Sequence, residues 1–367
     1  MKKLVYSALA LTLTSVPALA TDHAWSGLDK EIESLSNSLQ SSNTSGPKIG
    51  GWLITSYRHS SDLDGDSTVA GQQDQSGFQF DTVRLEVTGD ANADYSYKIS
   101  FELSNGNSDF HGASSNGNVQ LKDAYASFKI WENIKGRMGR FKEPVLRSAL
   151  VPENRLLFLD RTGLGDTLGR RDLGLMINGA FDVANWYVAA QDGSDGQGDE
   201  HTITLRVTAD VVGKAGTGMV EGAYAASDET NLSVGLAFQD NSALDKGRVV
   251  AAEASMTMGP FSAAAELVDF DKGDAGTFGL AHGIIGNDVA DTTPWDVTVS
   301  YAVTPEYELM GRYQDADDND DTSSFSLGVN RYIKGHDIKW QLSWTSVNTD
   351  NAVGDFDQLA AGLAVSL

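Results

Sequence analysis

The sequence of 367 residues contains no cysteine, which excludes disulfide bonds, thiolate nucleophiles and cysteine-ligated metals. Proline is scarce, with 7 residues, and only 21% of the residues are charged. Lysine and arginine number 27 against 51 aspartates and glutamates, so the formal charge is −24. This shortage of positive charge disfavours a nucleic-acid partner. Apolar residues still make up 41% of the chain, more than disordered proteins usually carry.

Long apolar runs are also missing, because no later segment approaches the roughly 18 residues of a transmembrane helix. The first twenty residues combine Lys2 and Lys3, an apolar run over 4–16 and an A-x-A site that ends at Ala20. They predict a secretory signal peptide (1–20) that is cleaved after Ala20, with a membrane anchor as the alternative. We therefore expect an exported protein that is either soluble or barrel-forming.

Residues 21–46 predict a short helix followed by a linker. Two heptads place apolar side chains at alternating spacings of three and four, namely Trp25, Leu28, Ile32, Leu35 and Leu39. Two heptads alone are marginal in water, so the pattern favours an oligomer in which several copies already lie together. The alternative is a helix that folds back on its own chain. The serine- and asparagine-rich residues 41–46 form the linker.

From about residue 47 to 367 the hydrophobic period becomes two. Residues 95–104 and 338–345, for example, alternate apolar with polar side chains, and the last strand ends this alternation at Leu367. Segments of about ten residues with one apolar face are typical of a transmembrane β-barrel, whereas soluble sandwich strands average about five or six. Short and long connections alternate, as turns and outer loops do in such barrels.

An even number of strands requires one choice. A first count gives seventeen, and the weakest candidate covers residues 219–226. We interpret 213–230 as one extended periplasmic turn, which leaves sixteen strands. The predicted fold is therefore all-β: a sixteen-stranded antiparallel transmembrane β-barrel with a short N-terminal coiled-coil-like helix. Sixteen strands enclose a water-filled lumen.

Three stretches resemble the phosphate-selective porin O and P family. They are 80–89 (FDTVRLEVTG) with 95–98 (YSYK), 121–128 (LKDAYASF), and 139–144 (GRFKEP) with 169–174 (GRRDLG). The resemblance is strongest over 49–192. It implies a trimeric sixteen-stranded channel in the outer membrane of a Gram-negative bacterium, whose third outer loop (143–169) folds into the lumen. The implied partners are outer-membrane lipid, lipopolysaccharide and small inorganic or organic solutes.

The third loop region is rich in positive charge. Residues 135–171 hold nine bases and four acids, a net charge of +5 in a strongly acidic chain. A charged loop across a narrow pore focuses its field on passing solutes. We expect a weak anion preference from the following constriction residues: Arg140, Lys142, Arg147, Arg155, Arg161, Arg170 and Arg171. The alternative is that these side chains only hold the loop in place through ion pairs with lumen acids such as Asp123, Glu86 and Glu102.

Strand parity nominates further residues that point into the lumen, since a charge facing lipid costs about 2–4 kcal/mol at mid-membrane. These residues are Arg84, Lys98, Asp123, Tyr125, Lys129, Arg206 and Arg312. Later strands carry no dense ladder of bases, so strict phosphate specificity is not expected. The chain ends in Leu367 rather than in the aromatic residue common among outer-membrane barrels, but the preceding alternation is intact.

Other site types have weak support. Asp315, Asp317 and Asp320 form a weak calcium candidate, and a solvated outer loop explains them better because the glycine and glutamate of an EF-hand are missing. The six histidines are scattered, with no H-E-x-x-H pair and no G-x-S-x-G elbow. We therefore expect no enzyme, metal or cofactor. The remaining alternative to a diffusion porin is a structural or adhesive barrel with a closed lumen.

Overall fold

The computed structural model describes residues 46–62, 75–104, 119–193, 201–213, 219–224, 226, 229–241, 247–271, 291–350 and 354–367. Pro47–Leu367 form one compact unit. The predicted signal peptide, helix and nearly all of the linker lie outside the described residues. Among the described residues, no helix combines the length and apolar character needed to cross a membrane.

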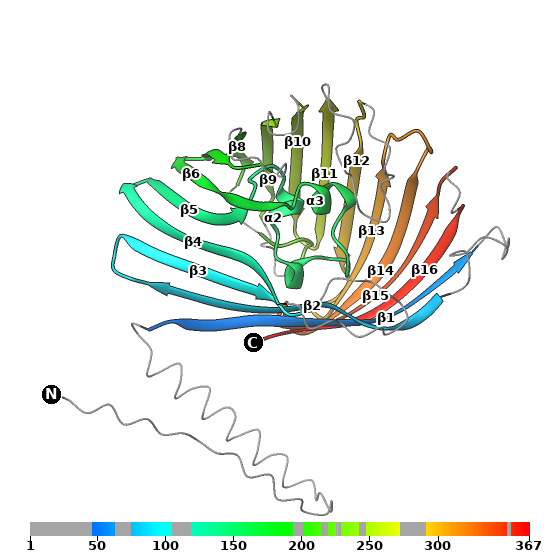
Figure 1. Cartoon of the computed structure of the whole chain (residues 1–367). Coiled ribbons are helices and arrows are strands. Elements are labelled where there is room, and N and C mark those ends of the chain that lie inside the picture. Colours follow the sequence, from blue (N-terminus) through cyan, green and yellow to red (C-terminus); the bar gives the residue numbers. More distant parts are fainter. Residues whose placement is uncertain are drawn as a thin grey trace, which may run out of the picture. The chain divides into compact units, whose positions relative to one another are not determined.

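Sixteen antiparallel strands form a closed barrel in which every strand pairs with its neighbours in the sequence (Figure 1). The first strand also pairs with the last, with Leu53 opposite Val365, so the sheet has no free edge. The strands are β1 (Lys48–Asp62), β2 (Gln75–Asp90), β3 (Tyr95–Glu102), β4 (Gln120–Trp131), β5 (Ile134–Lys142), β6 (Arg171–Phe181), β7 (Ala184–Gln191), β8 (Thr202–Val212), β9 (Asn231–Asn241), β10 (Gly247–Met258), β11 (Phe261–Asp271), β12 (Trp295–Ala302), β13 (Tyr307–Asp315), β14 (Ser323–Lys334), β15 (Ile338–Asn348) and β16 (Phe356–Ser366). The predicted fold class and strand number are confirmed.

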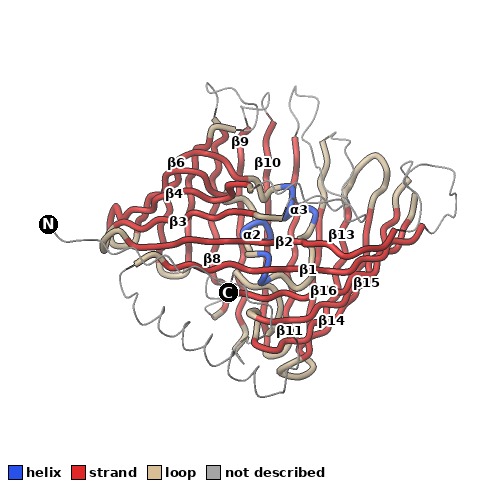
Figure 2. The backbone as a smooth tube through the Cα atoms, turned by 60° about the horizontal axis from the view of Figure 1, so that its bottom comes forward, coloured by secondary structure: helices blue, strands red, loops and turns tan. Residues whose placement is uncertain are grey.

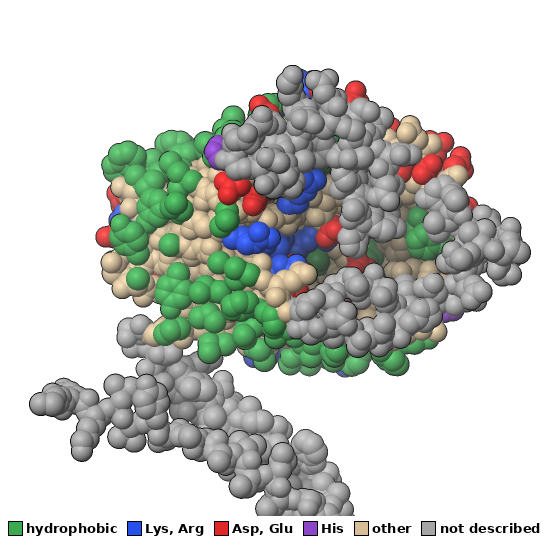
Figure 3. All heavy atoms as spheres, viewed as in Figure 1, with side chains coloured by type: hydrophobic (Ala, Val, Ile, Leu, Met, Phe, Trp, Pro, Cys, Tyr) green, Lys and Arg blue, Asp and Glu red, His purple; other side chains and the backbone are tan. Residues whose placement is uncertain are grey.

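The barrel is apolar outside and polar inside, the reverse of a soluble protein. On β15, Trp340 and Leu342 are exposed at 52% and 46%, whereas Lys339 and Gln341, which alternate with them, are buried. Successive side chains of a strand point to opposite faces, so this alternation sorts them between the outer surface and the lumen. Apolar side chains accordingly cover much of the outer wall in Figure 3.

The connections separate the barrel into a short-turn end and a long-loop end. Residues 132–133, 182–183 and 259–260 are two-residue turns between adjacent strands. Residues 213–230, here called turn 4, connect β8 to β9 at the same end, and their described part contains no strand, as predicted. Residues 143–170, here called loop 3, connect β5 to β6 at the other end and are described completely.

Candidate pore constriction

Loop 3 lies inside the barrel, where its short helices α2 (Arg147–Leu150), η1 (Glu153–Arg155) and α3 (Gly163–Thr167) occupy the centre of the ring of strands (Figure 2). Its apolar side chains reach strands far away in the sequence. Leu146, Leu164 and Leu168 pack with Val249, Val268 and Phe270 of β10 and β11. The loop therefore crosses the lumen from β5 and β6 to the opposite wall.

The segment Leu156–Leu159 fixes the loop to the wall, as its apolar composition predicts. All four side chains are at least 94% buried, and full burial of such a side chain contributes about 1.5–3 kcal/mol. Leu159 packs against Trp52 and Ile54 of β1. Polar wall residues bind the carbonyl groups of the segment: Lys339 donates to Leu156, and Asn330 and Gln341 donate to Leu157 at 2.9 Å and 2.7 Å.

A bend at the root of loop 3 brings its charges into the lumen. β4 pairs with β5 only as far as Ala124 opposite Arg140, whereas β5 continues to pair with β6 as far as Lys142 opposite Arg171. Gly139 at this point has a φ of +128°, and a Cβ there would lie 2.2 Å from the Ala124 carbonyl oxygen. Only glycine allows this close approach.

Five basic side chains and three carboxylates lie close together in the lumen, next to this bend. We call the basic side chains, Arg84, Lys122, Lys142, Arg161 and Arg171, the basic cluster. Arg84 lies 3.0 Å from Glu102 and 3.4 Å from Glu153 of loop 3. Arg161 lies 3.3 Å from Glu153. Arg171 pairs with Asp123 at 2.9 Å, and Ser100 donates to the same carboxylate. Figure 3 shows Lys and Arg side chains gathered in the hollow of the face it displays.

Lys122 and Lys142 are the two basic side chains by which the basic cluster outnumbers its carboxylates. Lys142 donates to the carbonyl of Ala149, and Lys122 forms no ion pair with a described residue. Burial by itself would raise the pKa of Glu153, but Arg161, Arg84 and Lys142 hold that pKa well below its usual range. The carboxylate is therefore charged at neutral pH, and the cluster sets five basic side chains against three carboxylates.

Arg58 of β1, which is not among the predicted lumen residues, is a second anchor of loop 3. Its guanidinium group lies 2.6 Å from Asp81 and binds both carboxylate oxygens of Asp160 in loop 3, at 2.5 Å and 2.8 Å. Arg312 of β13 donates to the carbonyl of Asp160 at 2.9 Å and lies over the Phe158 ring. These contacts hold the loop between two walls.

Turn 4 enters the barrel from the short-turn end and meets loop 3. The Glu221 amide donates to the Arg155 carbonyl at 3.0 Å, and the Leu157 amide donates back to the Glu221 carboxylate at 2.9 Å. Arg312 lies 3.5 Å from the same carboxylate. The lumen is therefore narrowed from both ends, which the prediction of a simple extended turn did not include.

Aromatic contacts secure turn 4 to the wall. Tyr224 stacks on Tyr332 with ring centroids 4.1 Å apart, and His336 meets both rings edge-on. Both ring nitrogens of His336 are buried without a hydrogen-bond partner in the described part of the chain. Burial and the nearby Lys339 and Arg155 lower the pKa of His336 to about 3, so the ring is neutral at pH 7.

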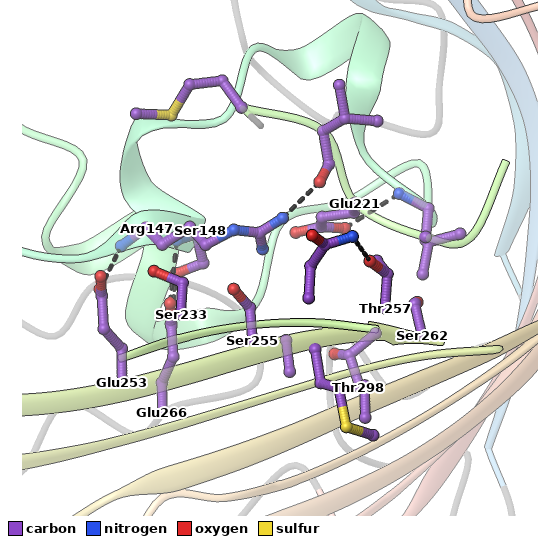
Figure 4. A pocket seen from close by; sticks show the side chains of 18 of the residues that line it. Arg147, Ser148, Glu221, Ser233, Glu253, Ser255, Thr257, Ser262, Glu266 and Thr298 are labelled. Carbon is purple, nitrogen blue, oxygen red and sulfur yellow. Dashed lines mark hydrogen bonds between the residues drawn. The ribbon is translucent and has the colours of Figure 1, made fainter. Parts of the chain in front are cut away.

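The wall formed by β10, β11 and β12 is acidic. Glu253, Glu266 and Asp296 lie in one row, because Glu253 is opposite Glu266 and Glu266 is opposite Asp296. They border a cavity of about 500 Å³ between loop 3, turn 4 and the wall (Figure 4). The Arg147 amide donates to Glu253 at 2.6 Å and the Ser148 amide to Glu266 at 2.9 Å.

The other predicted lumen residues are distributed over the wall. Lys98 pairs with Glu86 at 2.5 Å, and Arg206 pairs with Glu253. The Tyr125 ring carries the Arg137 guanidinium group 4.2 Å above it. Lys129 is exposed near the short-turn end of β4.

The remaining four constriction candidates lie outside the basic cluster. The Arg147 guanidinium donates to the Val220 carbonyl in turn 4, below the loop. Arg155 is exposed and lies close to His336. Arg140 lies on the face of β5 that carries Met138, which is 65% exposed. Arg170 accepts the Glu143 amide on its carbonyl at 3.0 Å.

The aspartates of the calcium candidate accept hydrogen bonds from nearby backbone amides. The Asp317 amide binds the Asp315 carboxylate, the Thr293 amide binds the Asp317 carboxylate, and the Asp320 carbonyl accepts the Asp350 amide. Within the described residues, no three acidic or histidine side chains are arranged to hold a metal ion.

Several lumen residues that were not predicted could have been recognised from the alternation of apolar and polar residues along their strands. Lys339 stands between the apolar residues Ile338 and Trp340 of β15, and Arg58 alternates with the exposed Tyr57 on β1. Glu266 and Asp296 alternate in the same way. No local pattern indicates that they form a row, because the register between strands decides which of them become neighbours.

The fold is that of a sixteen-stranded porin. It resembles a loop-deletion variant of OmpT from Vibrio cholerae (12% identity, TM-score 0.57, covering 88% of this chain and 99% of that one). It also resembles the channel DcaP of Acinetobacter baumannii (14%, 0.56, 88% and 97%) and OprB of Pseudomonas putida (10%, 0.57, 88% and 94%). A comparison with curated protein sequences gave no match.

The family follows from the sequence itself. Residues 55–355 match the family described as phosphate-selective porin O and P. The chain belongs to this family, as the motifs around loop 3 predicted, and it is accordingly an outer-membrane channel protein of the porin type.

Proposed function

We propose that this protein is a trimeric outer-membrane porin for the passive diffusion of small hydrophilic solutes, with a weak anion preference set by loop 3. The observation that carries the proposal is that the basic cluster has two more basic side chains than carboxylates, at the point where loop 3 narrows the lumen. Fixed charges on a narrow pore concentrate ions of the opposite sign. Because three guanidinium groups there are already paired, the preference is weak.

Phosphate and carboxylate solutes fit this arrangement better than a strict phosphate filter does. Lys122 and Lys142 are point charges that can attract an anion and release it, which conduction requires. The basic residues of β8–β16 do not form a ladder in the described part of the chain, since Arg206, Arg312 and Lys339 are each bound to loop 3, turn 4 or a neighbouring carboxylate.

The proposal extends to assembly and export. A trimer form of OmpT from Vibrio cholerae has a similar fold (12% identity, TM-score 0.56), and the heptads at 25–39 suit a trimer of this chain. We expect the mature chain to begin at Thr21, to face outer-membrane lipid and lipopolysaccharide, and to need no cofactor. The short turns would then lie on the periplasmic side.

The test is the reversal potential of the purified protein in a planar bilayer with a KCl gradient. The proposal expects discrete conductance steps and a modest preference for Cl⁻. A reversal potential of the sign for K⁺ would contradict the anion preference but leave the porin function intact. Absence of any step would favour the second candidate, a structural barrel with a closed lumen, for which the entry of both loop 3 and turn 4 into the lumen is the specific support.

A further inference from the structure

The acidic row on β10–β12 contains more negative charge than its surroundings balance. Glu266 and Asp296 are 6% and 3% exposed and lie directly opposite each other on neighbouring strands. Like charges in directly opposite positions repel each other. A buried pair of this kind therefore needs a positive partner, or it must share a proton.

The three carboxylates of the row differ in what they bind. Glu253 receives the Arg206 guanidinium group as well as the Arg147 amide. Glu266 receives only the amide and hydroxyl of Ser148. Asp296 is bonded by the Thr162 side chain, while its Oδ2 is buried without a hydrogen-bond partner among the described residues. Neither Glu266 nor Asp296 forms an ion pair within that part of the chain.

The cavity beside this row has the size and charge of a ligand site. Its volume of about 500 Å³ is within the range of roughly 300–1,000 Å³ that small-molecule pockets occupy. Five carboxylates and two guanidinium groups line it, and His336 on its border is neutral at pH 7. The lining therefore has three more acidic than basic side chains. Leu157 and Val220 add an apolar surface from loop 3 and turn 4.

We propose that this cavity binds the ammonium or guanidinium group of a small organic cation, with Glu266 and Asp296 as its acceptors. An ammonium group offers three donors, one of which would satisfy Asp296 Oδ2, and its alkyl chain would lie against Leu157 and Val220. A bare metal ion suits the site less well, because the described acidic groups are not arranged as a metal-binding set. This site is separate from the basic cluster and does not depend on the proposed anion preference.

The test is a binding measurement on the purified full-length protein in detergent, with n-butylammonium chloride as the probe and sodium butyrate as the anionic control. Isothermal titration is expected to show saturable binding of butylammonium alone. Asp296→Asn and Glu266→Gln should each weaken it at least tenfold. The matched control is Glu306→Gln, which removes an exposed carboxylate from the turn 303–306 and should bind as the wild type does.

A second variant decides the matter if the first two fail to fold. Ala264 precedes Glu266 by two residues on the same face of β11, so Ala264→Lys would place a tethered ammonium group beside the carboxylates. It should abolish butylammonium binding in a protein that still migrates as a folded barrel. Equal binding of butyrate, no saturation with butylammonium, or undiminished binding to the folded Ala264→Lys variant would overturn the proposal. None of these results bears on the reversal potential, so failure here is distinguishable from failure of the porin function.

Discussion

Buried carboxylates are paired with cations in one half of the barrel, whereas some in the other half are not. Along β1–β6 the carboxylates Asp81, Glu86, Glu102 and Asp123 each pair with a cation, and two lysines remain in surplus. Along β10–β12 the relation is reversed, since Glu266 and Asp296 form no ion pair with a described residue. Loop 3 crosses between these halves. The net charge of −24 therefore says little about the electric field at one point of the lumen, because strand register and ion pairing decide that field locally.

The largest effect is expected where a buried ion pair of the first half is broken. Arg58→Met leaves Asp81 and Asp160 without their guanidinium partner, and removal of one partner of a buried pair costs about 3–5 kcal/mol. The transition to the heat-denatured form on electrophoresis should move to a clearly lower temperature. The matched control is Arg248→Met, which breaks the exposed pair with Asp271 and should cost less than about 1 kcal/mol. Equal shifts in the two variants would show that loop 3 does not depend on Arg58.

Neutralising one carboxylate in each half should have opposite results. Glu102→Gln removes the partner of Arg84 and is expected to destabilise the barrel by about 2 kcal/mol. Glu266→Gln keeps an acceptor for Ser148 and relieves repulsion from Glu253 and Asp296, so its stability should equal or exceed that of the wild type. Parallel thermal scans measure both. A loss of stability in Glu266→Gln as large as that in Glu102→Gln would remove the contrast between the halves.

Acid should loosen turn 4 before it affects the basic cluster. The pKa of His336 is about 3 while turn 4 is docked and is expected to return to about 6.5 when it is released, so protonation favours release as pH falls below 6.5. Each pH unit between those values weakens docking by at most about 1.4 kcal/mol. After correction for the intrinsic pH dependence of exchange, the Gly222 and Ala223 amides should lose protection against hydrogen exchange over this range, and His336→Asn should remove that loss.

Glu153 has the opposite linkage. Its pKa is lowered in the folded protein, so its stabilising ion pairs are fully present above the unfolded pKa of about 4.3 and are lost only as pH falls through the lower folded value. Loop 3 should therefore stay docked at pH 5. Faster exchange at the loop 3 amides than at those of turn 4 on acidification to pH 5 would contradict this order.

The smallest effect concerns selectivity. Lys122→Gln and Lys142→Gln each remove one surplus positive charge from the basic cluster. At about 10 Å in water a unit charge contributes about 0.4 kcal/mol, with opposite signs for Cl⁻ and K⁺, so each change should lower the Cl⁻ to K⁺ permeability ratio at most about fourfold. The reversal potential in a KCl gradient measures it. Lys129→Gln, at the exposed short-turn end of β4, is the matched control and should leave the ratio close to that of the wild type.

The fold could be predicted because alternation and connection length are local properties of the sequence. They gave sixteen strands and the correct reading of 213–230 as a connection. The apolar run Leu156–Leu159 likewise indicated that loop 3 lies against the wall. Arg58 and Lys339 could have been found by the same parity that nominated Arg84 and Arg206.

The arrangement of the site needed the three-dimensional structure. Glu253, Glu266 and Asp296 become neighbours only through the register of three strands. Glu221 reaches loop 3 only because turn 4 enters the lumen. The position of Arg140 relative to Lys142 depends on where β5 leaves β4, which follows from the close approach at Gly139 and not from alternation.

The pairing of β1 with β16 also governs how the polypeptide reaches its final form. Trp52 lies opposite Ser366, so the seam joins the two most distant strands of the sequence. Ring closure must await synthesis, export and arrival of both segments, and such non-local pairing is intrinsically slow. A chain that is truncated before β16 would keep two unpaired strand edges, which could pair with other chains. Unpaired strand edges would therefore be the one physical feature by which quality control in the envelope could recognise an unfinished barrel.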